Sequence, residues 1–434
     1  MHKRIFWLGL LLALQLMGFL GWAPPVLVGP VLVGPALAAP VLDLPAPTAT
    51  SEESLFKEVW RIINRAYLDE SFNHQNWWLV RQQELRHPPK TRQETYEAIE
   101  TMLASLDDPF TRLLKPEQYR SLKVNTSGEL MGVGLQIALD ESGILEVLAP
   151  LAGSPAERAG IRARDRILAI DGRSTQEMTL DESAARMRGP VGTLVKLLLE
   201  RAQDRKHEEI QLVRDRITIN PVMAELHAPQ EGETDSPTIG YVRLSQFSAN
   251  ATEEVTEAIQ TLEQQGATAY ILDLRGNPGG LLDAGVGIAR LWIDRGAIVY
   301  TVNRQGVMGQ FDATGQALTD APLAVLVNRG TASASEILAG ALHDNDRAQI
   351  VGERTFGKGL IQSLFDLSDG SGLAVTVAKY ETPNGTDINK VGIMPDRVVS
   401  LDAIAPDQIG TPADPQYQAA ANLLTAAMVT AGAF

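Results

Sequence analysis

The sequence predicts a multidomain protein of α/β and α+β class, with a helical module, a compact β-rich domain and an α/β core. Three observations support this prediction. The chain has 434 residues, too many for one ordinary core, so two or three domains are expected. Residues 127–215 hold short β-like runs between glycines. From Thr238 onward strands alternate with amphipathic helices, which is typical of a largely parallel sheet.

The N-terminus has the features of a secretory signal peptide. A charged start (HKR, residues 2–4) precedes a mostly apolar run (residues 5–22) and the small-residue sequence ALAA (residues 36–39). We therefore expect residues 1–38 to be cleaved and the protein to be exported. A permanent N-terminal anchor is the alternative, because the apolar run is near spanning length. Residues 39–51 are rich in Pro, Ala and Thr and are expected to form a linker.

Composition excludes several kinds of chemistry. The chain has no cysteine, so disulfides, thiol catalysis and Cys-based metal sites are absent and stability must come from core burial. It carries 38 Lys and Arg against 53 Asp and Glu, and no dense basic run follows the N-terminus. This acidic balance makes nucleic acid a poor candidate partner.

Residues 52–126 are predicted to form a helical module. Apolar residues recur at the helical period in two stretches, Leu55, Val59, Ile62 and Ile63, then Tyr96, Ile99, Met102, Leu103 and Leu106. The aromatic residues fit the core of a small module packed on something larger: Trp60, Tyr67, Phe72, Trp77 and Trp78.

The remaining chain divides into three parts. Residues 127–215 contain strands of five to eight residues and one helix, and they form the compact domain. Residues 216–400 form the α/β core, where an amphipathic helix ends at Gly266. Residues 401–434 are Pro-rich at first and end in a helix near 416–428, which is expected to pack on the core.

Two loops of the core nearly match known motifs. DLRGNPGG (273–280) is one letter away from the GNSGG setting of the trypsin-like serine, but Pro278 has no nucleophile. GERTFGKG (352–359) matches a phosphate-binding loop as far as Lys358, but Gly359 stands where Mg²⁺ needs Ser or Thr. A strand-like run follows instead of the helix that binds phosphate. No histidine has a convincing base setting, so a His-based triad is also disfavoured.

Ser333 is the better candidate nucleophile. It follows a buried strand and a tight turn and directly precedes an amphipathic helix, where free N–H groups favour a developing oxyanion. Its small neighbours Gly330, Ala332 and Ala334 allow a substrate backbone to approach closely. The alternative is structural, because Ser333 and Glu336 also have the spacing of a helix capping box.

Lys358 is the candidate base for this serine. Its apolar and glycine neighbours favour the neutral amine, which is the form that accepts a proton. Serine–lysine pairs are a known variant of triad chemistry. If the next segment is a strand, Gln362 shares a face with Lys358 and can orient the amine without adding charge. A surface loop lysine is the alternative.

Together these motifs resemble the carboxyl-terminal processing proteases, which are serine endopeptidases with a Ser–Lys dyad. TASASE around Ser333, FGKG around Lys358, the 25 residues between them (333 to 358), Gln362 and GNPGG match the family pattern. The resemblance runs from about residue 52 to about residue 400. It implies Ser333 as nucleophile, Lys358 as general base and Gln362 as the residue that positions the lysine. The backbone N–H groups of Gly279 and Ala334 would form the oxyanion hole.

Residues 127–215 resemble a PDZ domain, a β-sandwich-like fold with helices. GVGL, made of Gly132, Val133, Gly134 and Leu135, stands where PDZ domains present backbone amides to a terminal carboxylate. Arg164 departs from the pattern because this position is commonly glycine: either the arginine bears the cost of a positive φ, or the turn differs there.

The resemblance implies an enzyme that binds the free C-terminus of a protein substrate and removes a C-terminal extension, without metal or cofactor. The signal peptide, helical module and single PDZ domain are most similar to the photosynthetic members, which trim a photosystem II reaction-centre polypeptide in the thylakoid lumen. A general periplasmic processing protease is the alternative within the family, and a non-catalytic PDZ adaptor is the alternative from another class. A monomer in the periplasm or lumen is expected, with at most peripheral contact with membrane-protein substrates.

Overall fold

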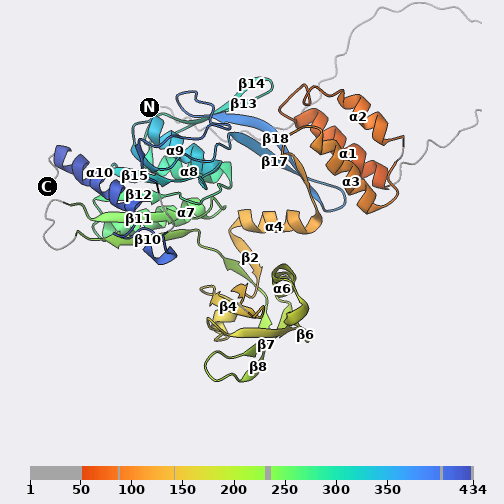
Figure 1. Ribbon diagram of the computed structural model, residues 1–434. Helices are drawn as coiled ribbons and strands as arrows, with labels where there is room; N and C mark the ends of the chain where they lie inside the picture. The colour runs from red at the N-terminus through yellow and green to blue at the C-terminus, as the bar shows by residue number, and fades with distance from the viewer. Residues whose placement is uncertain (1–50, 87, 141, 230–235, 401–403, 432–434) are drawn as a thin grey trace, which may run out of the picture. The chain divides into compact units, whose positions relative to one another are not determined.

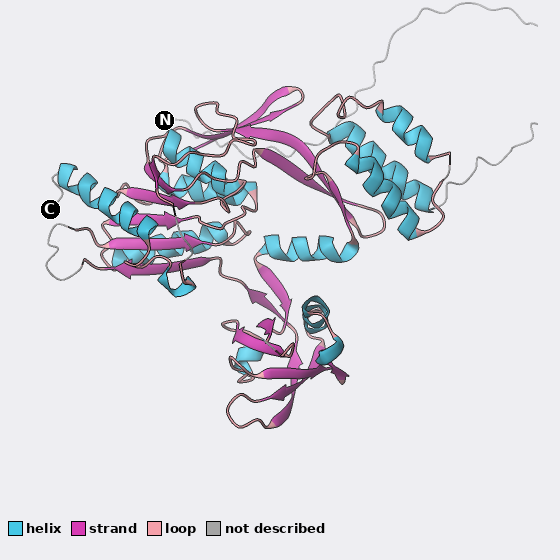
Figure 2. Cartoon of the chain, in the orientation of Figure 1, coloured by secondary structure: helices cyan, strands magenta, loops and turns pink. Residues whose placement is uncertain are grey.

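The computed structural model describes residues 51–86, 88–140, 142–229, 236–400 and 404–431. The expected signal peptide, residues 1–38, and all but the last residue of the linker lie outside the described residues. Within the described ranges, none of the helices has the length and apolar character needed to cross a membrane. The fold is mixed α/β, as predicted, and Figures 1 and 2 show its elements.

The first three helices form a bundle that packs on a β-strand of the core. These helices are α1 (Ser51–Ala66), α2 (Trp77–Glu84) and α3 (Arg92–Ala104). Their apolar residues share one core with Leu373 and Val375 of β18 (Gly372–Glu381). Trp77 is buried there, but Trp78 is 59% exposed, so its predicted core position is wrong. Adjacent helical residues point about 100° apart, so α2 can turn only one of the two indole rings inward.

A short connection leads from the bundle to the next domain. It consists of β1 (Arg112–Leu114), which pairs antiparallel with β18, and α4 (Pro116–Ser127). Helix α4 ends at Gly128, whose φ of 71° is the left-handed conformation that glycine adopts at little cost.

The β-rich domain holds a five-strand path with an added short strand, and a separate two-stranded pair. Its sheet runs β3-β4-β5-β7-β8, with β6 on β5, while β2 pairs with β9. Arg164 has a φ of 69°, so the turn keeps the conformation that glycine commonly adopts there. The elements are β2 (Glu129–Gly132), β3 (Leu135–Leu139), β4 (Leu145–Pro150), α5 (Pro155–Arg158), β5 (Arg166–Ile170), β6 (Arg173–Ser174), η1 (Thr175–Glu177), α6 (Leu180–Met187), β7 (Leu194–Glu200), β8 (His207–Val213) and β9 (Asp215–Thr218).

The core is built on a six-stranded sheet of order β10-β11-β12-β15-β16-β19, parallel except for β10. Its strands are β10 (Val222–His227), β11 (Ile239–Leu244), β12 (Ala269–Asp273), β15 (Leu323–Val327), β16 (Ala348–Gly352) and β19 (Arg397–Val398). Its helices are α7 (Ala251–Gln264), α8 (Leu282–Trp292), α9 (Ala334–Asp344), the short η2 (Pro406–Gln408) and α10 (Pro415–Ala431).

Alternation along the strands separates the helices into two layers. Val242 and Leu272 face α7, α8 and α9 in one buried cluster. Tyr241 and Ile271, one residue away on the same strands, face α10 in another cluster. The final helix therefore packs on the core, on the opposite side of the sheet (Figure 1).

A second, antiparallel sheet was not predicted as a unit. It runs β1-β18-β13-β14, with β17 paired to β18, and only the strand after Lys358 was predicted. The additional strands are β13 (Ala297–Asn303), β14 (Gly306–Asp312) and β17 (Leu360–Asp366).

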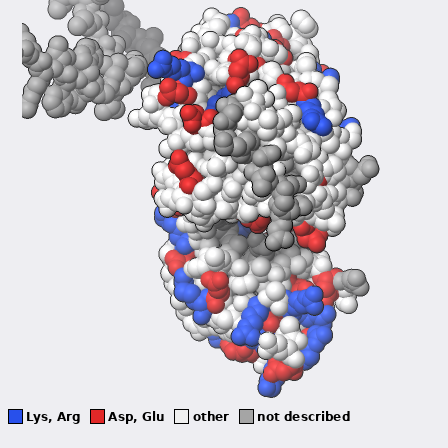
Figure 3. Space-filling model, turned by 90° about the vertical axis from the view of Figure 1, so that its left-hand side faces the viewer, with Lys and Arg blue, Asp and Glu red and all other residues white. Residues whose placement is uncertain are grey.

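On the face drawn in Figure 3, positive and negative side chains are interspersed.

Candidate active site

Ser333 lies at the junction between the turn after β15 and the first residue of α9. Its φ and ψ are 58° and −118°, a combination that non-glycine residues rarely adopt. Such a conformation costs on the order of 1–3 kcal/mol and is found mostly at functional sites. The Ser333 side chain makes no capping hydrogen bond to the helix. The structural alternative, in which the hydroxyl caps α9, requires that bond.

Glu336 joins the serine to the lysine loop. It is fully buried, and its Oε2 accepts hydrogen bonds from Ser333 N and Lys358 N, both at 2.9 Å. Its Oε1 accepts from Gly357 N at 2.7 Å and from Thr355 Oγ1 at 2.5 Å. From the sequence, Glu336 was predicted only as a capping partner. One half of that capping box exists, and the same carboxylate also holds the next loop in place.

Lys358 lies in the loop between β16 and β17. Burial lowers the pKa of its amine, the charge of Arg112 lowers it further, and Glu336 and Asp108 oppose the shift. The neutral amine is therefore more populated at a given pH than in an exposed lysine. Its Nζ lies 4.9 Å from the centroid of the Phe110 ring. Within the described part of the chain, no hydrogen bond joins Nζ to Ser333 Oγ or to Gln362.

Gln362 and Tyr380 line the same region from the antiparallel sheet. Gln362 pairs across strands with Thr376, and its Nε2 is buried without a partner among the described residues. The buried Tyr380 hydroxyl lies 2.5 Å from Lys358 O and 3.0 Å from Ser333 O, so it can donate to either carbonyl. Tyr380 was missed because its strand was not predicted.

The GNPGG loop packs directly against the serine turn. Gly279 has a φ of 97°, and a Cβ at this position would lie 2.8 Å from Ser333 Cβ and 2.9 Å from Ala334 N. Only glycine fits this contact. Gly279 N donates to Asn277 Oδ1 at 2.9 Å, whereas Ala334 N has no acceptor in the ranges described. The two amides predicted for the oxyanion hole are therefore neighbours, and one of them donates within its own loop.

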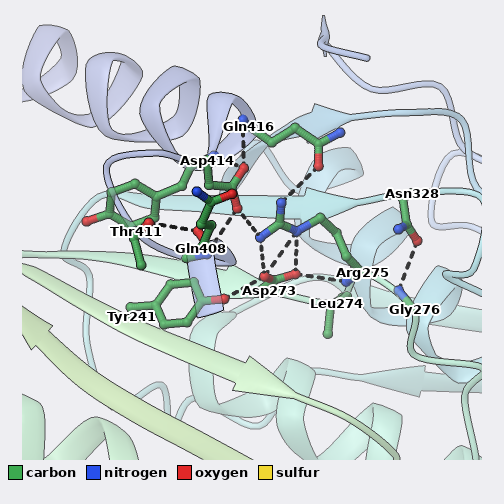
Figure 4. A network of polar contacts seen from close by, with 12 residues as sticks. Tyr241, Asp273, Leu274, Arg275, Gly276, Asn328, Gln408, Thr411, Asp414 and Gln416 are labelled. Atoms are coloured by element: carbon green, nitrogen blue, oxygen red, sulfur yellow. Dashed lines mark hydrogen bonds and ion pairs between the residues drawn. The ribbon is translucent and has the colours of Figure 1, made fainter. Parts of the chain in front are cut away.

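A buried ion-pair network fixes the strand end that precedes this loop (Figure 4). The Arg275 guanidinium contacts Asp273 Oδ2 at 2.6 Å and Asp414 Oδ2 at 2.7 Å. It also donates to Gln416 Oε1 at 3.0 Å, and Tyr241 OH donates to Asp273 Oδ2 at 2.6 Å. The end of β12 is thus connected to the start of α10.

The predicted carboxylate-binding loop joins β2 to β3. Gly132 ends one strand, Leu135 begins the next, and the N–H groups of Val133 and Gly134 donate to no protein group within the ranges described. Gly134 has a φ of 75°, and a Cβ there would lie 2.3 Å from Ser154 Cβ. The loop therefore presents free amides.

Comparison with known proteins decides the family. Residues 238–399 match peptidase family S41, and residues 146–201 match the PDZ domain. The chain is 60% identical over 383 residues to the carboxyl-terminal-processing protease of Synechocystis sp., across 88% of this chain and 89% of that protein. The chain belongs to the carboxyl-terminal-processing peptidase family.

Other members of the family include chloroplast proteins. The carboxyl-terminal-processing peptidase 2 of Arabidopsis thaliana is 48% identical over 81% of this chain and 70% of its own length. The solved structure of a photosystem II D1 C-terminal processing protease superposes with a TM-score of 0.56 at 43% identity, covering 85% of this chain and all of that one. Membership of this family makes the present protein a serine-type peptidase whose substrate is a protein.

Proposed function

We propose that this carboxyl-terminal-processing peptidase uses Ser333 as nucleophile and Lys358 as general base. The observation that carries the proposal is the Glu336 carboxylate, which binds the backbone N–H of both residues. It holds a strained serine with an uncapped hydroxyl beside a lysine whose pKa is lowered by burial. A neutral amine next to a serine at a helix start is the arrangement required for a Ser–Lys pair.

The reaction proceeds through an acyl-enzyme. Ser333 Oγ attacks the scissile carbonyl carbon while Lys358 Nζ takes its proton, and the leaving amine then receives that proton as the C–N bond breaks. The oxyanion accepts hydrogen bonds from Ala334 N and from Gly279 N. Gly279 N also donates to Asn277 Oδ1, so its hydrogen is shared between two acceptors. Water then attacks the ester, with Lys358 again taking and returning the proton. The Lys358–Ser333 hydrogen bond forms as substrate binds, because such contacts are often open in free enzymes.

Gln362 orients the lysine amine in this proposal. Its amide is neutral, so it can hold Nζ without favouring the ammonium, which a carboxylate would do. Its buried Nε2 has no other partner in the part of the chain described, so the amide is free to take this role.

Substrate selection belongs to the PDZ loop. Free N–H groups at Val133 and Gly134, between Gly132 and Leu135, fit the terminal carboxylate of an added strand. We propose a C-terminally extended photosystem II reaction-centre precursor as substrate, since a similar solved structure is named for D1 processing. The enzyme would act as a monomer in the thylakoid lumen or periplasm, and general periplasmic tail processing is the alternative.

The test is cleavage of a C-terminally extended peptide, followed by mass spectrometry. Ser333→Ala and Lys358→Ala should each lower kcat by roughly a thousandfold or more, because the pair acts as a unit. Gln362→Ala should cost less, and all three variants should keep the wild-type melting temperature. Near-full activity in Lys358→Ala would refute the dyad. A wild-type protein that binds the peptide tightly without turnover would instead support the adaptor alternative.

A further inference from the structure

The segment 107–112 of the helical module reaches the proposed base. Asp108 folds this segment into a tight turn, because its carboxylate accepts from Phe110 N at 2.9 Å and from Thr111 Oγ1 at 2.6 Å. Thr111 Oγ1 in turn accepts from Thr376 N of β18 at 3.0 Å. Strand β1 then continues the pairing, with Arg112 opposite Ala374. The turn is thus attached to the same sheet that carries Gln362.

This attachment places the half-buried Phe110 ring against the lysine amine. The distance of 4.9 Å from Lys358 Nζ to the ring centroid is within contact range for an amine over an aromatic face. Gln362 Nε2 and Thr376 Oγ1, which belong to directly paired residues, are both buried without partners in the described chain. An aromatic side chain of the helical module therefore contacts the amine, and within the described ranges no hydrogen bond joins the amine to Gln362.

We propose that Phe110 is a positioning residue for Lys358, whose ring covers one side of the amine and excludes water from it. The helical module would then complete the active site instead of serving only as a structural support. This inference rests on the proposed role of Lys358 as the general base.

The ring has two opposing effects on the pKa of Lys358, and their sizes differ. An aromatic face favours the ammonium by roughly two- to thirtyfold, whereas full burial lowers a lysine pKa by up to about 3 to 5. Asp108 and Glu336 also favour the ammonium, and Arg112 opposes it. Burial is the largest of these influences on Lys358 as a whole, and the ring supplies part of that burial, so we expect its loss to act chiefly by admitting water. The base works when neutral, so activity rises with pH through its pKa. Admitting water to the amine raises the pKa of Lys358, so the increase in activity occurs at higher pH.

The experiment compares Phe110→Ala with Phe110→Leu. The pH dependence of kcat/KM for the extended peptide is recorded from about pH 6 to about pH 10. For Phe110→Ala we expect the rising limb to move up by about one pH unit, with roughly tenfold less activity below it and an unchanged KM. Phe110→Leu keeps the apolar cover without the aromatic face, so it should not move the limb up; losing the attraction of the face for the ammonium moves the limb, if at all, to lower pH. Phe72→Ala removes another partly buried ring of the same module and should leave the limb in place.

Each outcome decides the matter. A limb that stays in place in Phe110→Ala, or that moves equally in Phe110→Leu, overturns the inference. If Phe110→Ala does not fold, Phe110→Val carries the same test with part of the cover removed. Lys358→Ala, measured in parallel, separates the two proposals: if it is inactive while the Phe110→Ala limb stays put, only the inference fails. If Lys358→Ala is active, the dyad itself fails.

Discussion

At the scale of single residues, Glu336 determines the geometry of the site. Within the described ranges its carboxylate accepts four hydrogen bonds, three from backbone N–H groups and one from the Thr355 hydroxyl. An ionised carboxylate suits this environment because it only accepts hydrogen bonds. One buried side chain therefore sets the distance between the Ser333 turn and the Lys358 loop.

Glu336→Gln should disturb this arrangement while keeping the shape. The amide NH₂ would face N–H donors, and unpaired buried donors cost about 1–3 kcal/mol of stability. We expect kcat to fall at least tenfold because the serine and lysine backbones are no longer held together. Loss of the negative charge, which raises the pKa of Lys358, should move the rising limb of the pH profile to lower pH. That direction is opposite to the one expected for Phe110→Ala.

Glu353→Gln is the matched control for this prediction. Glu353 is only partly buried, and its side chain makes no hydrogen bond or ion pair within the described ranges. Urea unfolding and the pH dependence of kcat/KM should both match wild type. If Glu336→Gln behaved like this control, Glu336 would not organise the site.

The sequence identifies the motif residues but not the residues that connect them. Ser333, Lys358 and Gly279 stand in local patterns of small residues that mark tight turns, and such patterns are readable from a few neighbouring positions. Phe110 and Tyr380 have no such pattern. They reach the site through strand pairing and packing between segments far apart in the chain, which hydrophobic periodicity does not encode.

At the scale of elements, prediction succeeded for the parallel sheet and found a single strand, β17, of the antiparallel one. Strands β12 and β15 are buried along their whole length, so they appear as continuous apolar runs. Strand β17, directly after Lys358, was predicted. Strand β13 was not: it includes partly exposed residues, and its pairing with β14 carries register shifts, which interrupts the alternation that marks a half-buried strand. The final helix was predicted, but not its attachment through Asp414 to the loop that carries Gly279.

Arg275→Met tests that attachment between elements. The variant removes the cation shared by two fully buried carboxylates, Asp273 and Asp414 (Figure 4). Breaking a buried ion pair in this way typically costs about 3–5 kcal/mol. We expect the free energy of unfolding to fall by that amount in urea, with α10 losing hydrogen-exchange protection first. Arg397→Met, an exposed arginine without a partner in the described chain, should change stability by less than about 0.5 kcal/mol.

At the scale of the whole molecule, the residues proposed for recognition and those proposed for chemistry lie in different parts of the chain. Residues 146–201 match a PDZ domain, whereas Ser333 and Lys358 lie within the peptidase match at 238–399. The connecting strands β2 and β9 pair with each other, from Glu129 opposite Thr218 to Gly132 opposite Asp215. Changes to the substrate's C-terminus should therefore affect binding without altering the bond-breaking groups.

Amidation of the substrate's C-terminus tests this separation directly. It replaces the carboxylate that the Val133 and Gly134 amides are proposed to bind, and hydrogen bonds to a charged group contribute about 1.5–3 kcal/mol. Steady-state kinetics should therefore show KM rising by roughly ten- to a hundredfold for the amide, with kcat within about twofold. Gly134→Ala, whose Cβ would clash with Ser154, should raise KM for the free acid and leave the amide almost unaffected. Equal KM values for acid and amide in the wild-type enzyme would mean that this loop does not read the free terminus. The PDZ domain would then contact an internal stretch of the substrate, since strand addition can proceed without a terminal carboxylate.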